Sequence, residues 1–144
     1  SQAVLLAGRL GLPSEVAATL ATACAAVMAA EIALGREPTE QVHNNPGFDI
    51  LSEDPETGMS YFIEVKGHRP ANTEIKVSAN QVRMAKMNPE RFRLAVVSVP
   101  QDALAQPSRV RYLVRPFDDY EPYFAQTYLP LNVEALLQNS VDPI

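Results

Sequence analysis

Two short β-type stretches on either side of a turn constrain this chain more than any other feature of its sequence. Residues 47–50 (GFDI) and 63–66 (IEVK) flank residues 54–58 (DPETG), which are rich in turn-forming types. A symmetric hairpin over this region has its centre in the middle of the turn, at equal distances from Asp49 and Glu64. The sequence therefore predicts that these two carboxylates face each other across neighbouring strands.

The predicted hairpin gathers three charged groups into one patch. Directly opposed side chains on neighbouring strands lie about 4.5–5.5 Å apart at Cβ, and like charges at that distance destabilise the pair. Two such carboxylates have either a raised pKa or a bound cation. The period of two along a strand also puts Lys66 on the same face as Glu64. A Glu-x-Lys pattern is common on ordinary solvent-facing strands, so it is Asp49 that makes the patch a candidate divalent-metal site.

A glutamate inside an apolar helix stripe is the next unusual feature. The stripe consists of Leu20, Cys24, Val27 and Met28. At about 100° per residue, Glu31 falls within it, and burying an unpaired charge costs several kcal/mol. Two explanations are open. Glu31 either forms a salt bridge with an arginine such as Arg36 or Arg69, or reaches the two hairpin carboxylates as a third ligand.

The remaining elements predict the fold class of this 144-residue chain. Helices are expected over 14–34, with Ser14 as the N-cap and Gly35 as the stop, and over 78–87. Strands are expected over 47–52, 60–66, 94–99 and 110–114. The core then covers about 14–116, and the Pro-rich tail over 117–144 is expected to be irregular apart from a short helix near 133–137. This order predicts one mixed α/β domain with a central sheet flanked by helices.

Charge is unevenly distributed along the chain. Residues 76–117 carry eight basic and two acidic side chains, although the whole chain has a net charge of −5. Such a basic block after an acidic candidate site is suited to holding a phosphodiester backbone. The candidates for contact with nucleic acid are His68, Arg69, Lys76, Arg83 and Lys86. The alternative is that these are ordinary solvated charges, with His68 a surface histidine.

Several classes of protein are disfavoured. Neither His43 nor His68 has metal-ligand spacing to another histidine or to cysteine, which argues against a zinc site. Cys24 is the single cysteine, so no internal disulfide forms and a reducing cytoplasm is expected. No Walker-type phosphate loop is present, and no apolar run approaches the roughly 18 residues of a membrane span. We therefore expect a cytoplasmic protein without a membrane partner.

Gln81 has two possible roles. Residues 78–81 (SANQ) fit a capping box, in which Ser78 and Gln81 satisfy each other's backbone amides. The same glutamine opens the helix that follows the Glu-x-Lys strand, which makes it a candidate catalytic residue. Both roles remain open at this point.

Together these residues resemble a known family. A glutamate in a first helix, an aspartate beside one strand, Glu-x-Lys on the next and a polar residue opening the following helix resemble the PD-(D/E)XK nuclease superfamily. More narrowly, residues 31–38 (EIALGREP), 45–50 (NPGFDI) and 61–67 (YFIEVKG) resemble a domain related to the C-terminal domain of the NO VEIN protein. The similarity extends over roughly residues 28–99.

The resemblance implies a restriction-endonuclease-like fold and cleavage of DNA. It implies that Glu31, Asp49 and Glu64 bind Mg²⁺ or Mn²⁺ and that Lys66 orients or activates water. Bacterial versions are often fused to SWI/SNF-type helicases or occur in phage-defence and restriction systems, so a helicase domain of the same polypeptide is an expected partner. The chain departs from the pattern twice: Phe48 replaces the proline of the superfamily, and Gln81 replaces the glutamate usual in the subfamily.

Two other functions remain open. One is a nuclease fold that has lost catalysis and binds DNA or protein beside a helicase. The other is a structural α/β domain in which Glu31 is salt-bridged. Fold class alone does not distinguish them.

Overall fold

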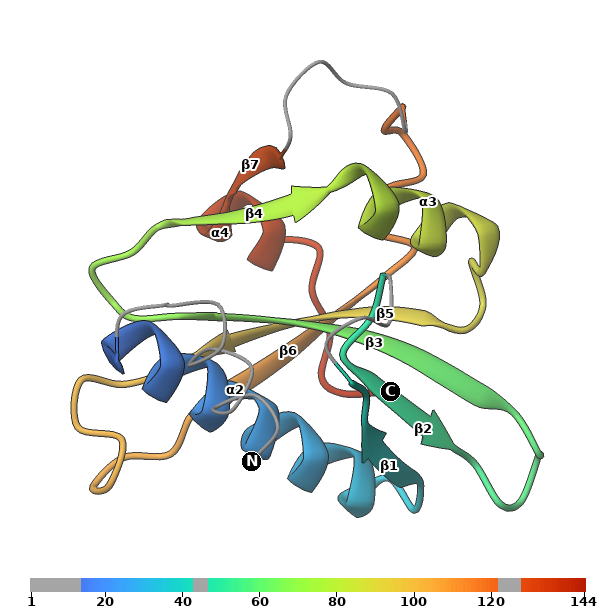
Figure 1. The fold of residues 1–144 in the computed structure, drawn as a ribbon, viewed down its shortest axis with the longest axis horizontal. Helices are drawn as coiled ribbons and strands as arrows, with labels where there is room; N and C mark the ends of the chain where they lie inside the picture. The colour runs from blue at the N-terminus through green and yellow to red at the C-terminus, as the bar shows by residue number, and fades with distance from the viewer. Residues whose placement is uncertain (1–13, 43–46, 122–127) are drawn as a thin grey trace.

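The computed structural model describes residues 14–42, 47–121 and 128–144 (Figure 1). His43 and the first residues of the 45–50 motif lie outside the described residues. The helices are α2 (Ser14–Ala33), α3 (Ala79–Met87) and α4 (Val133–Leu137). The strands are β1 (Glu37–Glu40), β2 (Ile50–Glu53), β3 (Ser60–His68), β4 (Glu74–Ser78), β5 (Phe92–Ser98), β6 (Arg109–Val114) and β7 (Tyr128–Asn132).

The strands form one five-stranded and one two-stranded sheet. The larger sheet has the order β1-β2-β3-β5-β6, and the smaller one pairs β4 with β7. Strands β3 and β5 are parallel and the other neighbours in the larger sheet are antiparallel. Parallel neighbours require a crossover, and here the chain crosses through β4 and α3. The predicted mixed α/β fold is confirmed, and the arrangement is consistent with a restriction-endonuclease-like fold.

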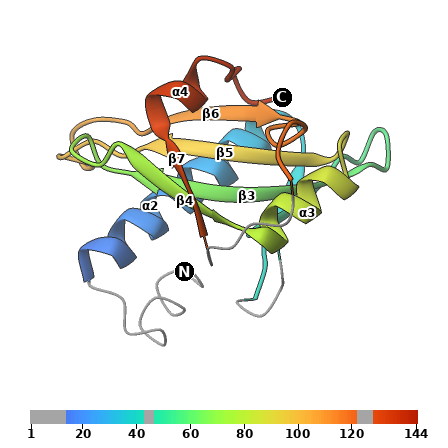
Figure 2. The ribbon, with the colours of Figure 1, turned by 90° about the horizontal axis from the view of Figure 1, so that it is seen from above.

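The central sheet has a different covering on each face. Helix α2 lies on one side, whereas α3, β4 and α4 lie on the other, as Figures 1 and 2 show from two directions. An apolar cluster under α2 includes Val27, Ile63 and Val65. A second cluster on the opposite face includes Val82 and Phe92. The fold therefore has three layers, with the sheet in the middle.

Side chains alternate along β3, so every second one faces α2 and the others face α3. Ile63 and Val65 belong to the cluster under α2, so Glu64 points to the α3 side of the sheet. Near the end of the strand, a Cβ added at Gly67 would lie 2.8 Å from the Cβ of Ala23. Glycine at this position therefore allows α2 to approach β3 closely, and the helix covers the face away from Glu64.

Helix α2 is apolar around most of its circumference. Residues Glu15–Ala33 are long and apolar enough to cross a membrane by length and composition alone, contrary to the sequence-based expectation. In the described fold, Ala23 and Val27 on its inner side are fully buried against the sheet. These contacts pack one side of the helix against the sheet, and 28% of the apolar window is buried inside the described fold.

The main differences from the predicted elements lie at the sheet margins. Strand β1 was not expected, because Pro38 and its charged neighbours weaken a strand prediction. Strands β4 and β7 were also missed, since the 49 residues over 79–127 separate them in the sequence. The tail is not merely irregular: it contains β7 and the predicted short helix, and Phe117 and Leu131 enter the core.

Candidate active site

Asp49 is held against the third strand by two backbone contacts. The register pairs Ile50 with Ile63, so the hairpin has the centre predicted from the sequence. Asp49 lies one residue before β2, and its N–H donates to the Ile63 carbonyl at 2.8 Å. Its Oδ2 accepts the Val65 N–H, also at 2.8 Å. The carboxylate is therefore fixed beside Glu64 by the backbone of β3.

Glu64 is buried next to a second acid. Its side chain is almost inaccessible, with 3% of the residue exposed. Burial raises its pKa well above the ordinary value of 4.5, the negative charge of Asp49 and a hydrogen bond with Asp49 raise it further, and Lys66 lowers it. The Lys66 ammonium lies 3.8 Å from Oε2 of Glu64. Two carboxyl groups and one ammonium group thus form one cluster, as the sequence predicted.

Gln81 forms the predicted capping box and also contacts Glu64, and its catalytic role remains a prediction. Its Oε1 accepts the Ser78 N–H at 2.9 Å, and its own N–H donates to the Ser78 hydroxyl at 3.2 Å, which completes the capping box. Its Nε2 donates to Oε2 of Glu64 at 3.0 Å. Because the cap fixes the amide oxygen, Gln81 presents its donor end to the site. It therefore orients Glu64 and does not present an oxygen ligand.

The backbone before Asp49 is shaped by a glycine. Gly47 has a φ of +91°, and a Cβ there would lie 3.0 Å from the Cβ of Met84 on α3. A side chain at position 47 would therefore meet both backbone strain and steric contact. The next residue, Phe48, places its ring 5.0 Å from that of Phe62. These contacts fix the approach of the chain to Asp49.

Glu31 is not brought to this cluster. It is fully buried, but its carboxylate accepts from NH1 of Arg36 at 3.1 and 3.3 Å and from the Tyr112 hydroxyl at 2.6 Å. Burial and the hydrogen bond with Glu31 raise the pKa of Tyr112 above its ordinary value. Of the two explanations open at the sequence level, the structure shows the salt bridge with Arg36.

The position of Glu31 changes the predicted ligand set. It projects from α2, on the opposite side of the sheet from the Glu64 carboxylate. Among the described residues, no group of three or more His, Cys, Asp or Glu side chains is arranged to hold a metal ion. The residues that could hold one are therefore Asp49 and Glu64, and their role as ligands remains a prediction.

Two of the predicted nucleic-acid contacts have other partners. His68 is buried rather than at the surface, with Nε2 2.9 Å from the Ser98 hydroxyl and Nδ1 3.1 Å from the Asn72 carbonyl oxygen. Arg69 donates from Nε to the Thr19 hydroxyl at 2.9 Å and from NH1 to a backbone carbonyl. Both residues join the end of β3 to its neighbours, so the expectation of a surface histidine is wrong.

The other three candidates lie on β4 and α3. Lys76 is exposed on β4. Arg83 is hydrogen-bonded to Asn80 on the same helix, and Lys86 donates to the Asp118 carbonyl at 3.0 Å. Within this set, and among the described residues, Lys76 alone is exposed and its side chain forms no hydrogen bond or ion pair. Its role in binding nucleic acid remains a prediction.

Three arginines of the basic block contact residues of the segment over 118–144. Arg93 donates to the Ile144 carbonyl, Arg111 forms an ion pair with Asp142, and Arg115 forms one with Asp118. A sequence signal for this was present, because residues 118–144 carry five acidic side chains and no basic ones. The basic block therefore serves, in large part, to hold the acidic tail.

Cys24 has no nucleophilic role in this arrangement. It is buried, and burial raises the pKa of its thiol to about 12, with smaller contributions from the charges of Asp49, Glu40 and Glu64. The thiol therefore stays protonated near neutral pH.

Comparison with known proteins gives one match. The model of the family described as "Protein NO VEIN, C-terminal" matches residues 21–113, which include Glu31, Asp49, Glu64, Lys66 and Gln81. Searches of the curated proteins and of the solved structures found no match. The family match covers well over half of the 144 residues. The chain belongs to the family of the C-terminal domain of the NO VEIN protein.

Proposed function

We propose that this chain is a metal-dependent nuclease domain that hydrolyses phosphodiester bonds of DNA. The observation that carries the proposal is the cluster of Asp49, Glu64 and Lys66 on one side of β3. A buried pair of acids whose charges repel each other is costly to the fold unless it has a function. A cation between the two carboxylates would relieve that repulsion.

The donor set fits Mg²⁺ or Mn²⁺. Mg²⁺ prefers oxygen ligands and keeps several of its waters, so one or two carboxylates suffice. Among the described residues, N–H groups of the protein contact Oδ2 of Asp49 and Oε2 of Glu64. The two carboxyl groups also share a hydrogen bond, and a metal ion bound between them would take the place of its proton. Bound there, the ion would lower the pKa of a coordinated water and neutralise charge on the scissile phosphate.

The other residues of the cluster position these groups. The Lys66 side chain is 19% exposed, so its ammonium is held by Glu64 and still borders solvent. Such a cation stabilises negative charge that develops on a phosphate or on attacking water. Gln81 fixes the orientation of Glu64 through its Nε2. The resemblance to the PD-(D/E)XK superfamily assigns the lysine a similar role, and it supports a helicase-linked or defence context.

Replacement of the lysine tests this proposal most directly. We expect Lys66→Ala to lower Mg²⁺-dependent cleavage of DNA by at least about 100-fold, because a transition-state charge contact is worth that much. The matched control is Arg109→Ala, which removes an exposed cation of β6 outside the predicted site and should leave most of the activity. Circular dichroism and thermal unfolding would show that both variants are folded. Equal cleavage by wild type and Lys66→Ala would refute the nuclease assignment.

A second candidate function is a non-catalytic module for DNA or protein binding. It is favoured by the tail contacts of Arg93, Arg111 and Arg115, which leave fewer cations for a nucleic-acid backbone. Calorimetric titration with Mn²⁺ distinguishes the two. A nuclease site binds the ion in wild type and loses it in Asp49→Ala, whereas the module shows no binding in either protein.

A further inference from the structure

A cavity lies on the α3 side of the central sheet, apart from the candidate active site. It is bordered by the end of β6, the segment over 115–120, β7 and α4, and its volume is about 620 Å³. Figure 1 shows α4 and this segment on the same side of the sheet as α3. Asp49, Glu64 and Lys66 do not line it. A cavity of this size is large enough for a small organic ligand.

The cavity has an apolar floor with an aromatic ring beside it. Leu113 and Leu131 line it and are themselves buried in the apolar cluster on this side of the sheet, and Leu136 of α4 adds to the same surface. The ring of Tyr120 also lines the cavity and lies 5.6 Å from the ring of Phe117, which is buried in the core. A fixed aromatic ring above aliphatic side chains suits a planar ring system.

One wall of the cavity depends on an unusual backbone conformation at Arg115. Its φ is +54°, in the left-handed region that residues other than glycine seldom adopt. Its Nε donates to Oδ2 of Asp118 at 2.7 Å, and its NH1 lies 3.7 Å from Oε1 of Glu90. Lys86 of α3 donates to the Asp118 carbonyl at 3.0 Å. Such a conformation persists where surrounding contacts fix it, and it often occurs at ligand sites.

The rim of the cavity carries polar side chains that the fold does not use. Within the described parts of the chain, the side chains of four lining residues form no hydrogen bond or ion pair: Asp119, Tyr120, Gln138 and Asn139. Asp119 offers two acceptor oxygens, and each carboxamide offers a donor and an acceptor. The cavity therefore combines an apolar floor with a small set of convergent polar groups.

These groups match the edge of one nucleobase. Guanine alone among the standard bases has two adjacent N–H donors on its Watson–Crick edge, next to the O6 acceptor. A carboxylate accepts two parallel hydrogen bonds, and a carboxamide N–H donates to O6 or N7. Stacking of a base on tyrosine adds affinity without regard to its identity. The carboxylate is thus the group that distinguishes guanine from the other bases.

We propose that the cavity between β6, β7 and α4 binds guanine, with Asp119 as the acceptor of its two donors and Tyr120 as its stacking partner. The carboxamides of Gln138 and Asn139 contact the O6 and N7 side of the base. The inference goes beyond the proposed function, because it concerns binding of a base and not hydrolysis of a phosphodiester. Lys86 connects the cavity wall to α3, the helix that also carries Gln81.

Binding of free nucleotides tests the proposal. GMP, AMP, CMP and dTMP are titrated into the 144-residue protein in EDTA, and saturation-transfer NMR and calorimetry follow binding. We expect GMP to bind at least about 10-fold more tightly than the other three, because a hydrogen bond to a charged group is worth that much. EDTA removes metal ions from Asp49 and Glu64, so the result is independent of nuclease activity. Equal affinity for the four nucleotides would overturn the proposal.

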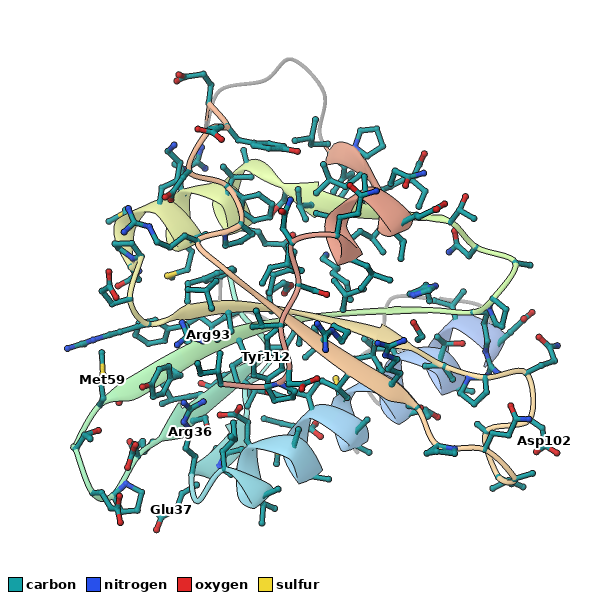
Figure 3. All side chains as sticks on the ribbon, turned by 180° about the vertical axis from the view of Figure 1, so that it is seen from behind. Arg36, Glu37, Met59, Arg93, Asp102 and Tyr112 are labelled. Carbon is teal, nitrogen blue, oxygen red and sulfur yellow. The ribbon has the colours of Figure 1, made fainter. Side chains whose placement is uncertain are left out.

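A substitution at Asp119 shows whether the base is recognised in this cavity. Asp119 is exposed, and Asp119→Asn replaces one acceptor by a donor, so GMP should bind about 10-fold more weakly, at the level of AMP. Asp102→Asn is the matched control, at an exposed acid on the loop between β5 and β6, which Figure 3 shows away from α4. It should keep the full preference for GMP. An unchanged preference in Asp119→Asn would overturn the assignment, and thermal unfolding would show that both variants are folded.

Displacement of GMP identifies the source of the base. Displacement by a guanine-containing single strand alone would support an unpaired guanine as the ligand, and displacement by the duplex as well would support a base taken out of the stack. Displacement by neither, with GMP bound, would support a free nucleotide. N-acetyl-arginine amide also has paired N–H donors. Binding of this compound in preference to GMP would indicate a basic peptide and would overturn the proposal.

Discussion

Two buried glutamates of this protein have opposite surroundings. Glu31 is fully buried, yet it has a cation and a hydroxyl as partners, in Arg36 and Tyr112. Glu64 is nearly as buried, but it faces Asp49, another acid, and its ammonium partner Lys66 is 3.8 Å away. The charge of Glu31 is neutralised by its partners, whereas Glu64 and Asp49 are two acids held side by side.

The contrast separates the structural role of Glu31 from the functional role that we propose for Glu64. A carboxylate paired with a guanidinium and a hydroxyl has little reason to bind a further ligand, because its oxygens are already occupied. A carboxylate beside another carboxylate gains free energy when a cation or a proton arrives. Sites that conflict with stability are expected where function requires them. Burial alone therefore did not identify the candidate site; the identity of the neighbours did.

The largest effect on stability is expected at Glu31. Glu31→Gln leaves Arg36 buried without its carboxylate partner, and breaking a buried ion pair in this way costs about 3 kcal/mol. Unfolding in urea, followed by circular dichroism, measures the loss. Glu37→Gln, at an exposed position of β1, is the matched control and should change stability by less than about 0.5 kcal/mol.

The cleavage activity of Glu31→Gln tests whether Glu31 takes part in the candidate active site. The folded fraction of Glu31→Gln should cleave DNA at a rate near that of wild type, because Glu31 does not contact the Asp49 cluster. Unchanged stability combined with lost metal binding would instead make Glu31 a ligand, as the family resemblance implies.

At Glu64, in contrast, we expect a substitution to raise the stability of the fold. Glu64→Gln removes a negative charge beside Asp49 and retains a side chain that can accept from Gln81, so stability at neutral pH should rise by about 1 kcal/mol. Mg²⁺-dependent cleavage should be lost in the same protein. The free energy of unfolding from urea titration and a cleavage assay measure the two effects.

The pH dependence of stability provides an internal control for the Glu64→Gln prediction. The pKa of Glu64 is higher in the folded protein than its ordinary value of 4.5, so the folded state binds the extra proton between these two values. Its contribution to stability is fully present below pH 4.5 and is lost as pH rises toward the folded-state pKa. The advantage of Glu64→Gln should therefore grow from pH 4 to pH 8. A constant difference across that range would show that neither burial nor Asp49 raises the pKa of Glu64 in the folded protein.

Much of this site was predictable from sequence because it depends on local geometry. The distance from the turn placed Asp49 opposite Glu64, and the strand period placed Lys66 with them. The capping box likewise followed from the spacing of Ser78 and Gln81. Each of these relations involves a few neighbouring residues and one regular element. It can therefore be predicted without knowledge of the tertiary fold.

The relations that could not be predicted are long-range. The Tyr112 hydroxyl meets Glu31 across 81 positions of sequence, and Arg93 meets Ile144 across 51. The side of the sheet that α2 covers decides whether Glu31 reaches Asp49, and helical periodicity shows only that Glu31 faces inward. Charge balance between the basic block and the acidic tail was visible in the sequence, but the pairing of particular residues was not.

The smallest effect is expected from metal binding itself, and it connects the two glutamates. A ligand that binds only the folded state stabilises it by about 0.8 kcal/mol at a concentration about three times Kd, so millimolar Mg²⁺ or Mn²⁺ should raise the melting temperature by a few degrees. Asp49→Asn should lose this rise, because it removes one of two ligands. Glu31→Gln should keep the same rise above its own lower baseline, because Arg36 and Tyr112 occupy that carboxylate in the folded protein. Loss of the rise in both variants would mean that the two glutamates act on one metal site, and the separation between them drawn from the fold would be wrong.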